Sequence, residues 1–266
     1  MPTFDGATGR VYYKAWRVPA PRAAAMVFLH GFGEHSGLYH RLGNTLNRAG
    51  IELWALDEIG HGLTEGDRAV IGSIDDLVEN GRRLTSLAEA VQPGAPVWLA
   101  GHSLGSAAAA VSVARDPGRY AGLILSAALL SPLDWVVALA EDDAAELALD
   151  ASDLSSDPFY LDELAYDPLA FTSAAGGRSL ATVLPAAWAE LDGFAQVPLP
   201  VLFVHGSDDP VIPVTQARDW AGRLKRARLA EFAGARHDIL NETVHQQAAA
   251  AITEFILTAG GDPGGA

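Results

Sequence analysis

The chain has 266 residues, of which 49% are hydrophobic, and this is enough for one large α/β domain or two small domains with a buried core. Its 18 basic and 33 acidic residues give a formal net charge of −15, which opposes binding to nucleic acid or to an anionic membrane surface. The absence of cysteine excludes disulfides, zinc–thiolate sites and thiol nucleophiles.

The N-terminus carries no recognisable targeting signal. Residues 1–16 lack the cationic start and the apolar core of a signal peptide. No uninterrupted apolar stretch approaches the roughly 20 residues that cross a bilayer. We therefore expect a soluble, cytoplasmic protein without an integral membrane span.

Short apolar runs bounded by turn residues alternate with segments of helical period, a pattern typical of parallel strands joined by crossover helices. Residues 10–18 predict a strand of an antiparallel hairpin at one edge of the sheet. Runs that are apolar at successive positions indicate a sheet covered on both faces. These runs predict strands at 24–31, 51–57, 97–101, 122–128, 201–206 and 228–234.

Segments of helical period lie between the predicted strands. From Ser73 onward, apolar residues fall on one helical stripe, and Ser73 and Asp76 have the spacing of a capping box. This pattern predicts a helix that begins at Ser73. Further helices are expected at about 39–49, 104–115, 214–225 and 242–258.

The alternation stops in residues 129–192, a segment rich in Ala, Leu and acidic residues. Because it is too long for an ordinary connection, we expect an inserted, mostly helical cap on a core formed by 1–128 and 193–258. Residues 259–266 are expected to form a disordered tail. Several apolar residues of the cap could line an acyl pocket or pack the cap on the core: Leu133, Trp135, Val136, Leu139, Leu147, Phe159, Leu180, Leu184 and Trp188.

Ser103 lies between Gly101 and Gly105, where a predicted strand passes into a predicted helix. A strand–turn–helix junction of this kind is so sharp that only glycine avoids a clash at the flanking positions, and the serine becomes exposed at the carboxyl edge of the sheet. The helix N-terminus beneath it supplies free N–H groups. The context therefore predicts a nucleophilic serine in preference to a chance glycine-rich turn.

A serine nucleophile needs a base and an orienting carboxylate, which follow in the order Ser, Asp, His in this type of fold. Asp209 follows the predicted strand 201–206, and His237 follows the predicted strand 228–234. A parallel sheet brings these residues to the same edge as Ser103. The spacing favours Asp209 as the acid, with Asp208 as the alternative.

The tetrahedral intermediate of acyl transfer also needs two hydrogen-bond donors. The backbone N–H of Leu104, directly after the nucleophile, is one candidate. The second is the N–H of Phe32 in the glycine-rich loop after the predicted strand 24–31.

Several segments resemble the α/β-hydrolase superfamily, and within it the monoacylglycerol lipase and lysophospholipase branch. The resemblance implies a mostly parallel eight-stranded sheet with helices on both faces and an inserted helical cap that moves over an acyl tunnel. It also implies ester hydrolysis without a metal or organic cofactor, with Ser103, Asp209 and His237 as the catalytic triad and Phe32 and Leu104 as oxyanion donors. The segments are HGFGEHSGLY (30–39), DEIGHGLTEGDR (57–68), GHSLG (101–105), DPLAF (167–171), HGSDDPVIP (205–213) and GARHDILNE (234–242).

The remaining polar candidates concern the substrate or the structure. No pair of histidines has metal-ligand spacing, and His30, His61, His102 and His205 each adjoin a glycine, so we expect them to bond the backbone in tight loops. Some relatives have a basic residue at the position of Leu38 that helps to hold the glycerol group. Arg178 is the only basic residue of 129–192, which favours a neutral ester unless Arg178 binds a carboxylate. The candidate substrate-binding residues are Glu34, His35, Leu38, Trp135, Phe159, Arg178 and Trp188.

Three functions are therefore considered. The first is a serine hydrolase that cleaves a monoacylglycerol or a similar neutral ester with an apolar acyl part through an acyl-enzyme. The second is a carboxylesterase or lactonase that acts on another ester, including a xenobiotic one. The third is a non-catalytic ligand-binding protein on the same scaffold. We expect no metal and no cofactor in any of them.

Overall fold

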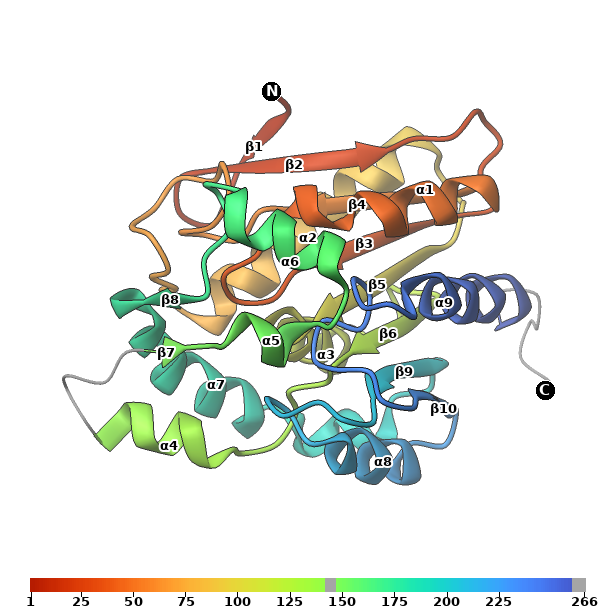
Figure 1. Ribbon diagram of the computed structural model, residues 1–266. Coiled ribbons are helices and arrows are strands. Elements are labelled where there is room, and N and C mark those ends of the chain that lie inside the picture. Colours follow the sequence, from red (N-terminus) through yellow and green to blue (C-terminus); the bar gives the residue numbers. More distant parts are fainter. Residues whose placement is uncertain (142–146, 260–266) are drawn as a thin grey trace.

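A mixed eight-stranded sheet forms the centre of the protein, for which a computed structural model describes residues 1–141 and 147–259 (Figure 1). The strand order is β1-β2-β4-β3-β5-β6-β9-β10, with antiparallel pairing in β1-β2 and β2-β4 and parallel pairing elsewhere. The predicted α/β class, with a mostly parallel sheet and an antiparallel edge, is confirmed. The strands are β1 (Thr3–Asp5), β2 (Arg10–Trp16), β3 (Ala24–Leu29), β4 (Ile51–Leu56), β5 (Val97–His102), β6 (Gly122–Ser126), β9 (Val201–Gly206) and β10 (Ala227–Phe232).

The central strands are buried on both faces, as their continuous apolar runs indicate. In β3, Val27 and Leu29 belong to one hydrophobic cluster, whereas Met26 and Phe28 belong to another. Successive side chains of a strand point to opposite faces, so the two clusters lie on the two sides of the sheet. Each face therefore has its own core.

Five helices cover the two faces of the sheet. α1 (His40–Arg48) and α9 (His245–Ala259) pack in one cluster, whereas α2 (Ile74–Val91), α3 (Leu104–Arg115) and α8 (Val214–Arg223) pack in the other. Each of them lies close to its predicted range. At the start of α2 the hydroxyl oxygen of Ser73 accepts a hydrogen bond from the Asp76 amide at 3.2 Å, as the capping spacing predicts.

The described residues of the predicted inserted segment 129–192, which are 129–141 and 147–192, come between β6 and β9 in the chain and lie over the carboxyl end of the sheet (Figure 1). The inserted segment contains a small antiparallel pair, β7 with β8, in addition to the helices that its sequence predicts. No described helix combines the length and hydropathy that crossing a bilayer requires. Of the predicted tail 259–266, residues 260–266 lie outside the described part of the chain. The elements of this region are α4 (Asp134–Glu141), β7 (Leu147–Ala148), α5 (Ala151–Leu154), α6 (Pro158–Tyr166), β8 (Ser173–Ala174), α7 (Leu180–Ala189) and the 3-10 helices at Ala175–Ser179 and Leu191–Gln196.

Helix α6 is attached to the core by polar contacts along its length. Asp157 caps its N-terminus through the amide of Phe159 and pairs with Arg41 at 2.7 Å. Further along, Glu163 contacts His40 at 2.9 Å, and beyond the helix Asp167 contacts His35 at 3.0 Å. These contacts fix the position of α6 relative to the loop and helix that follow β3.

A buried ion pair joins β4 to the segment before β3, at the end of the sheet opposite the predicted site. Glu52 is 1% exposed and contacts Arg22, which is 5% exposed, at 2.6 Å. Glu52 also accepts a hydrogen bond from Trp54 Nε1, and Arg22 donates to the Ala88 carbonyl in α2. The pair therefore links the sheet to the end of a covering helix.

Replacing Glu52 by leucine should lower the free energy of unfolding by about 3–5 kcal/mol, because the Arg22 guanidinium stays buried without its carboxylate. Urea denaturation followed by circular dichroism measures this loss. The double variant R22M/E52L should recover most of it, since no buried charge is left unpaired. Arg17, which also contacts Glu52 at 2.6 Å, has a side chain that is 47% exposed. A loss below about 1 kcal/mol for E52L would show that the pair is solvated in solution.

Candidate active site

The backbone at Ser103 is strained. Ser103 has φ +49° and ψ −118°, directly before the first residue of α3. A Cβ added to Gly101 would lie 2.1 Å from the Gly105 carbonyl oxygen, and one added to Gly105 would lie 2.1 Å from the Leu29 carbonyl oxygen. Neither position has room for a side chain, which is the physical reason for the two glycines that flank the serine.

Three side chains distant in sequence meet at the carboxyl edge of the sheet. His237 Nε2 lies 3.0 Å from Ser103 Oγ, and His237 Nδ1 lies 2.9 Å from Asp209 Oδ2. Ser103 follows β5, Asp209 follows β9 and His237 follows β10, so the parallel sheet brings them together. Asp208, the alternative acid, is exposed and accepts a hydrogen bond from the Ser207 hydroxyl.

The hydrogen bonds of Asp209 fix its orientation and its charge. Oδ1 accepts the backbone N–H groups of Val211 and Ile212, both at 2.9 Å, and Oδ2 contacts His237 at 2.9 Å and His205 Nε2 at 3.1 Å. Burial would raise the pKa of Asp209, but the charge of His237 and hydrogen bonds from His205 and His237 outweigh it and hold this pKa below its usual range. Asp209 is therefore ionised.

The same pair sets the state of His237, which is 3% exposed. Burial would lower the pKa of His237, but the Asp209 carboxylate outweighs it and raises this pKa above its usual value, with smaller contributions from Asp238 and Glu34. Because the carboxylate accepts a hydrogen bond from Nδ1–H, the neutral ring presents Nε2 as an acceptor to the Ser103 hydroxyl. This arrangement suits a general base.

The two predicted oxyanion donors lie beside Ser103. Leu104 is the first residue of α3, where a backbone N–H has no partner within the helix. Phe32 lies in a turn that is closed by the Glu34 amide donating to the Gly31 carbonyl at 3.3 Å. Gly33 in this turn has φ +83°, and a Cβ there would lie 2.0 Å from the Phe171 carbonyl oxygen. The oxyanion role of Phe32 and Leu104 stays a prediction.

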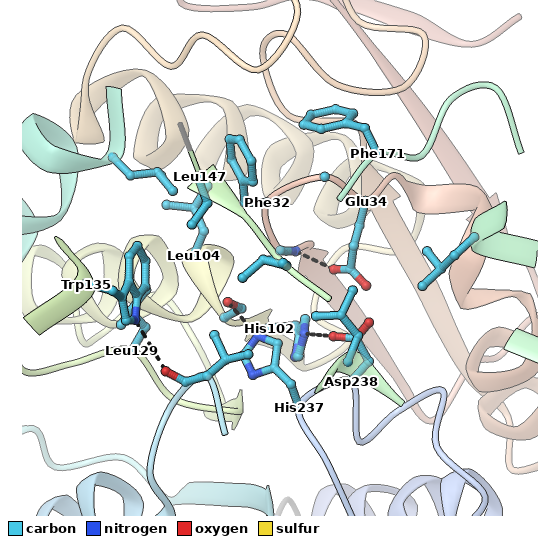
Figure 2. Close-up of a pocket in the computed structure, with 18 residues that line it drawn as sticks. Phe32, Glu34, His102, Leu104, Leu129, Trp135, Leu147, Phe171, His237 and Asp238 are labelled. Atoms are coloured by element: carbon cyan, nitrogen blue, oxygen red, sulfur yellow. Dashed lines mark hydrogen bonds and ion pairs between the residues drawn. The ribbon is translucent and has the colours of Figure 1, made fainter. Parts of the chain in front are cut away.

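A narrow cavity borders Ser103 and His237 (Figure 2). Its free volume is about 30 Å³, whereas pockets that hold drug-sized ligands measure roughly 300–1,000 Å³. The wall side chains must therefore shift to admit an acyl chain. Most of the wall is apolar: Phe32, Leu104, Leu129, Trp135, Leu147, Leu149, Leu154, Leu164, Phe171, Leu180 and Val211, with Glu34, His102 and Asp238 as its polar members beside the catalytic candidates.

The structure divides the substrate-binding candidates into two groups. Glu34 and Trp135 line the cavity, and Trp135 Nε1 donates to the Val211 carbonyl at 3.3 Å. The other candidates do not line it: His35 bonds Asp167, Leu38 packs in the core on the α1 side and Phe159 is 53% exposed, while Arg178 and Trp188 lie elsewhere in the inserted segment.

The apolar residues of the inserted segment divide in the same way. Leu147 and Leu180 line the cavity together with Trp135. Val136, Leu139 and Leu184 are buried in the core on the α2 side, and Leu133 and Trp188 pack against that core. The set therefore contains residues that line the cavity and residues that pack in the core; an acyl-binding role for the lining residues stays a prediction.

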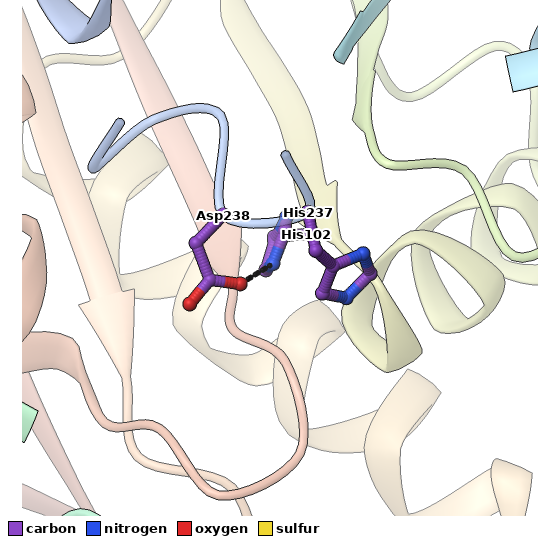
Figure 3. Close-up of side chains that lie close together, drawn as sticks. All are labelled: His102, His237 and Asp238. Carbon is purple, nitrogen blue, oxygen red and sulfur yellow. Dashed lines mark hydrogen bonds and ion pairs between the residues drawn. The ribbon is translucent and has the colours of Figure 1, made fainter. Parts of the chain in front are cut away.

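Within the described ranges, one cluster has the composition of a metal site: His102, His237 and Asp238 (Figure 3). Each offers a ligand atom, and these atoms lie within 4.8 Å of one another. His102 Nε2 contacts Asp238 at 3.1 Å, and both nitrogens of His237 contact Ser103 and Asp209. A metal bound here would displace the hydrogen bonds that orient the base.

The expectation that four histidines bond the backbone is correct for three of them. The rings of His30, His61 and His205 contact the carbonyl oxygens of Gly31, Ile59 and Ile212. His102 is the exception, because its ring contacts the side chains of Ser126 and Asp238. The prediction for His102 was wrong because its partners come from strands and loops that only the folded sheet brings together.

Two polar residues of this region were not identified from the sequence. Asp238 directly follows His237 and lines the cavity, so its position was the only signal available. Tyr160 in α6 is 0% exposed and contacts both Glu34 and Asp238. Nothing in its local sequence distinguishes Tyr160 from a core tyrosine.

Comparison with known proteins agrees with this architecture. Residues 20–244 match the family Hydrolase_4, described as serine aminopeptidase, S33, and the chain belongs to this family. The fold is that of the α/β-hydrolases. The monoacylglycerol lipase of Mycolicibacterium smegmatis is 28% identical over 96% of each chain. The human monoglyceride lipase is 34% identical over 50% of this chain and 43% of its own length.

A solved structure extends the comparison. The crystal structure of the Paleococcus ferrophilus monoacylglycerol lipase superposes with a TM-score of 0.77 and 28% sequence identity. It covers 94% of this chain and 99% of its own. The similarity therefore includes the inserted segment as well as the sheet.

Proposed function

We propose that the protein is a serine carboxylic ester hydrolase that acts on monoacylglycerols or similar neutral esters through an acyl-enzyme intermediate. The observation that carries this proposal is the chain of contacts from Asp209 through His237 to Ser103 on a strained elbow. The similarity to monoacylglycerol lipases over nearly the whole chain supports it.

The mechanism follows from the geometry. Ser103 Oγ attacks the ester carbonyl carbon while His237 Nε2 takes the hydroxyl proton, and the N–H groups of Phe32 and Leu104 stabilise the oxyanion. The C–O bond to the leaving alcohol then breaks, and His237 gives its proton to that alcohol. Water attacks the acyl-enzyme with His237 as the base, which releases the acid and restores Ser103.

The polar groups of the cavity favour an ester over an aminopeptidase substrate. An aminopeptidase needs an acid that is free to bind the α-ammonium group of its substrate. The acids beside the reacting serine are Glu34 and Asp238, and their oxygens already contact Gly31, Tyr39, Tyr160 and His102. The apolar wall instead suits an uncharged acyl chain.

A substrate panel tests the proposal. Purified protein should show a burst followed by steady turnover on p-nitrophenyl esters, release fatty acid from monoacylglycerols, and leave aminoacyl p-nitroanilides intact. A fluorophosphonate probe should label Ser103 in wild-type protein and leave S103A unlabelled. Preference for short alkyl or aromatic esters over monoacylglycerols would favour the carboxylesterase alternative, and absence of both turnover and labelling would favour a ligand-binding role.

A further inference from the structure

A buried tyrosine hydroxyl lies between two buried carboxyl groups beside the proposed catalytic residues. Tyr160 Oη is 2.8 Å from Asp238 Oδ2 and 3.1 Å from Glu34 Oε1. Tyr160, Asp238 and Glu34 are 0%, 4% and 5% exposed. They come from α6, from the loop that carries His237 and from the loop that carries Phe32, so one hydroxyl connects three parts of the site.

The number of protons in this group is limited. A phenol carries one proton and can donate it to one carboxylate at a time. If both acids were ionised, the second contact would place two oxygen lone pairs against each other in a buried site. A carboxyl proton donated to the phenol oxygen removes this conflict, so a single proton held by one acid satisfies both contacts.

The remaining contacts, together with the burial of Glu34, favour this acid as the one that holds the proton. Glu34 Oε2 accepts the Gly31 amide at 2.7 Å and the Tyr39 hydroxyl at 2.6 Å, so the proton belongs on Oε1, which faces Tyr160. Tyr160 then donates to Asp238 at the shorter of its two distances. Burial raises the pKa of Glu34 and outweighs the lowering by His102 and by the hydrogen bonds from Tyr39 and Gly31, and the nearby charge of Asp238 raises this pKa further.

We propose that Glu34, Tyr160 and Asp238 form a positioning group that holds one shared proton on Glu34 and leaves one negative charge, on Asp238, beside His237. This inference rests on the proposed function. Glu34 holds the Gly31 amide in the turn that carries Phe32, and Asp238 holds the ring of His102, the residue before Ser103. The group fixes the oxyanion turn and the serine elbow relative to each other.

The charge on Asp238 has a consequence for the base. A carboxylate oxygen of Asp238 lies within 4.8 Å of a ring nitrogen of His237, so the Asp238 charge favours the protonated imidazole. The other titratable groups around this site are Tyr39, His102 and Asp209, with His30 and His35 in the loop after β3. Removing the Asp238 charge should therefore lower the pKa of His237, so that the ring stays neutral and can act as a base at a lower pH.

The pH dependence of kcat/KM in amide variants tests where the proton lies. Glu34→Gln imitates the protonated acid, so the midpoint of the acid limb should stay at its wild-type value. Asp238→Asn removes the charge, so the midpoint should fall by about one pH unit. Equal shifts in both variants would show that both acids are ionised, and a shift in E34Q alone would place the proton on Asp238. Either result would overturn the proposal.

Two further measurements do not depend on the pH profile. Infrared spectroscopy at neutral pH should show the C=O absorption of protonated carboxyl groups in wild-type protein. E34Q should lose one component of it, while the component of Glu58, a buried acid whose pKa burial also raises, remains. A wild-type-minus-E34Q difference spectrum without a lost component would contradict the assignment. Tyr160→Phe should lower kcat about tenfold with KM within twofold, whereas Tyr166→Phe, which changes an exposed tyrosine of the same helix, should change neither. Wild-type kcat in Y160F would also contradict the proposal.

The tests separate this proposal from the proposed function. Fluorophosphonate labelling of Ser103 and ester turnover by the wild-type protein test the function alone. The infrared band tests the shared proton in a protein with or without activity. Circular dichroism of each variant shows whether it is folded. If Y160F does not fold, the pH profiles of E34Q and D238N decide whether the proposal holds.

Discussion

Replacing Ser103 by alanine should lower kcat for ester hydrolysis by a factor on the order of 10⁶ and leave KM nearly unchanged. The variant keeps the cavity and the proposed oxyanion donors, so it still binds the ester, but it has no oxygen that can form the acyl-enzyme. Steady-state kinetics on a p-nitrophenyl ester, together with a test for the burst phase, measures the loss.

The matched control for S103A is the variant His237→Ala. The two residues act as one unit, so each single substitution and the double substitution should cause nearly the same loss. Circular dichroism should show that both variants are folded. Retention of more than about one per cent of the wild-type kcat in S103A, with contaminating esterase excluded, would show that another group is the nucleophile.

Replacing Asp209 by asparagine should lower kcat by a factor on the order of 10⁴, because the variant stabilises the wrong tautomer of His237. The amides of Val211 and Ile212 both donate to Oδ1, so the asparagine carbonyl oxygen takes that place and its NH₂ group faces His237. His237 Nδ1 must then accept a hydrogen bond, and the ring proton moves to Nε2. A protonated Nε2 is unable to take the Ser103 proton.

Asp208 provides the control for this prediction. Asp208→Asn changes the neighbouring, exposed carboxylate and should keep kcat within about twofold of the wild-type value. The loss in D209N should persist at all pH values, since the ring proton is misplaced even when His237 is neutral. A larger loss in D208N than in D209N would instead assign the orienting acid to Asp208.

The sequence predicted those parts of the structure that depend on local pattern. The parallel strands were visible because each is a continuous apolar run, and the start of α2 because Ser73 precedes acidic residues at the capping distance. The arrangement of Ser103, Asp209 and His237 was predictable because strand ends of a parallel sheet share one edge.

The parts that the sequence did not predict depend on contacts between distant elements. Tyr160 looks like any buried aromatic residue of a helix until α6 is placed over the loops of Glu34 and Asp238. The choice between Leu147, which lines the cavity, and Leu184, which packs in the core, depends on the orientation of β7 and α7. Apolar composition alone carries no such information.

The backbone conformation of Ser103 exposes the nucleophile and at the same time lowers the stability of the fold. A non-glycine residue at φ +49° and ψ −118° costs on the order of 1–3 kcal/mol, a notable part of the 5–15 kcal/mol by which domains are typically stable. A relative that only binds a ligand and catalyses no reaction would be more stable with glycine at this position, because glycine adopts this conformation without the steric cost. Glycine in place of the serine, in a relative that keeps the other residues of the site, would therefore indicate that catalytic activity has been lost.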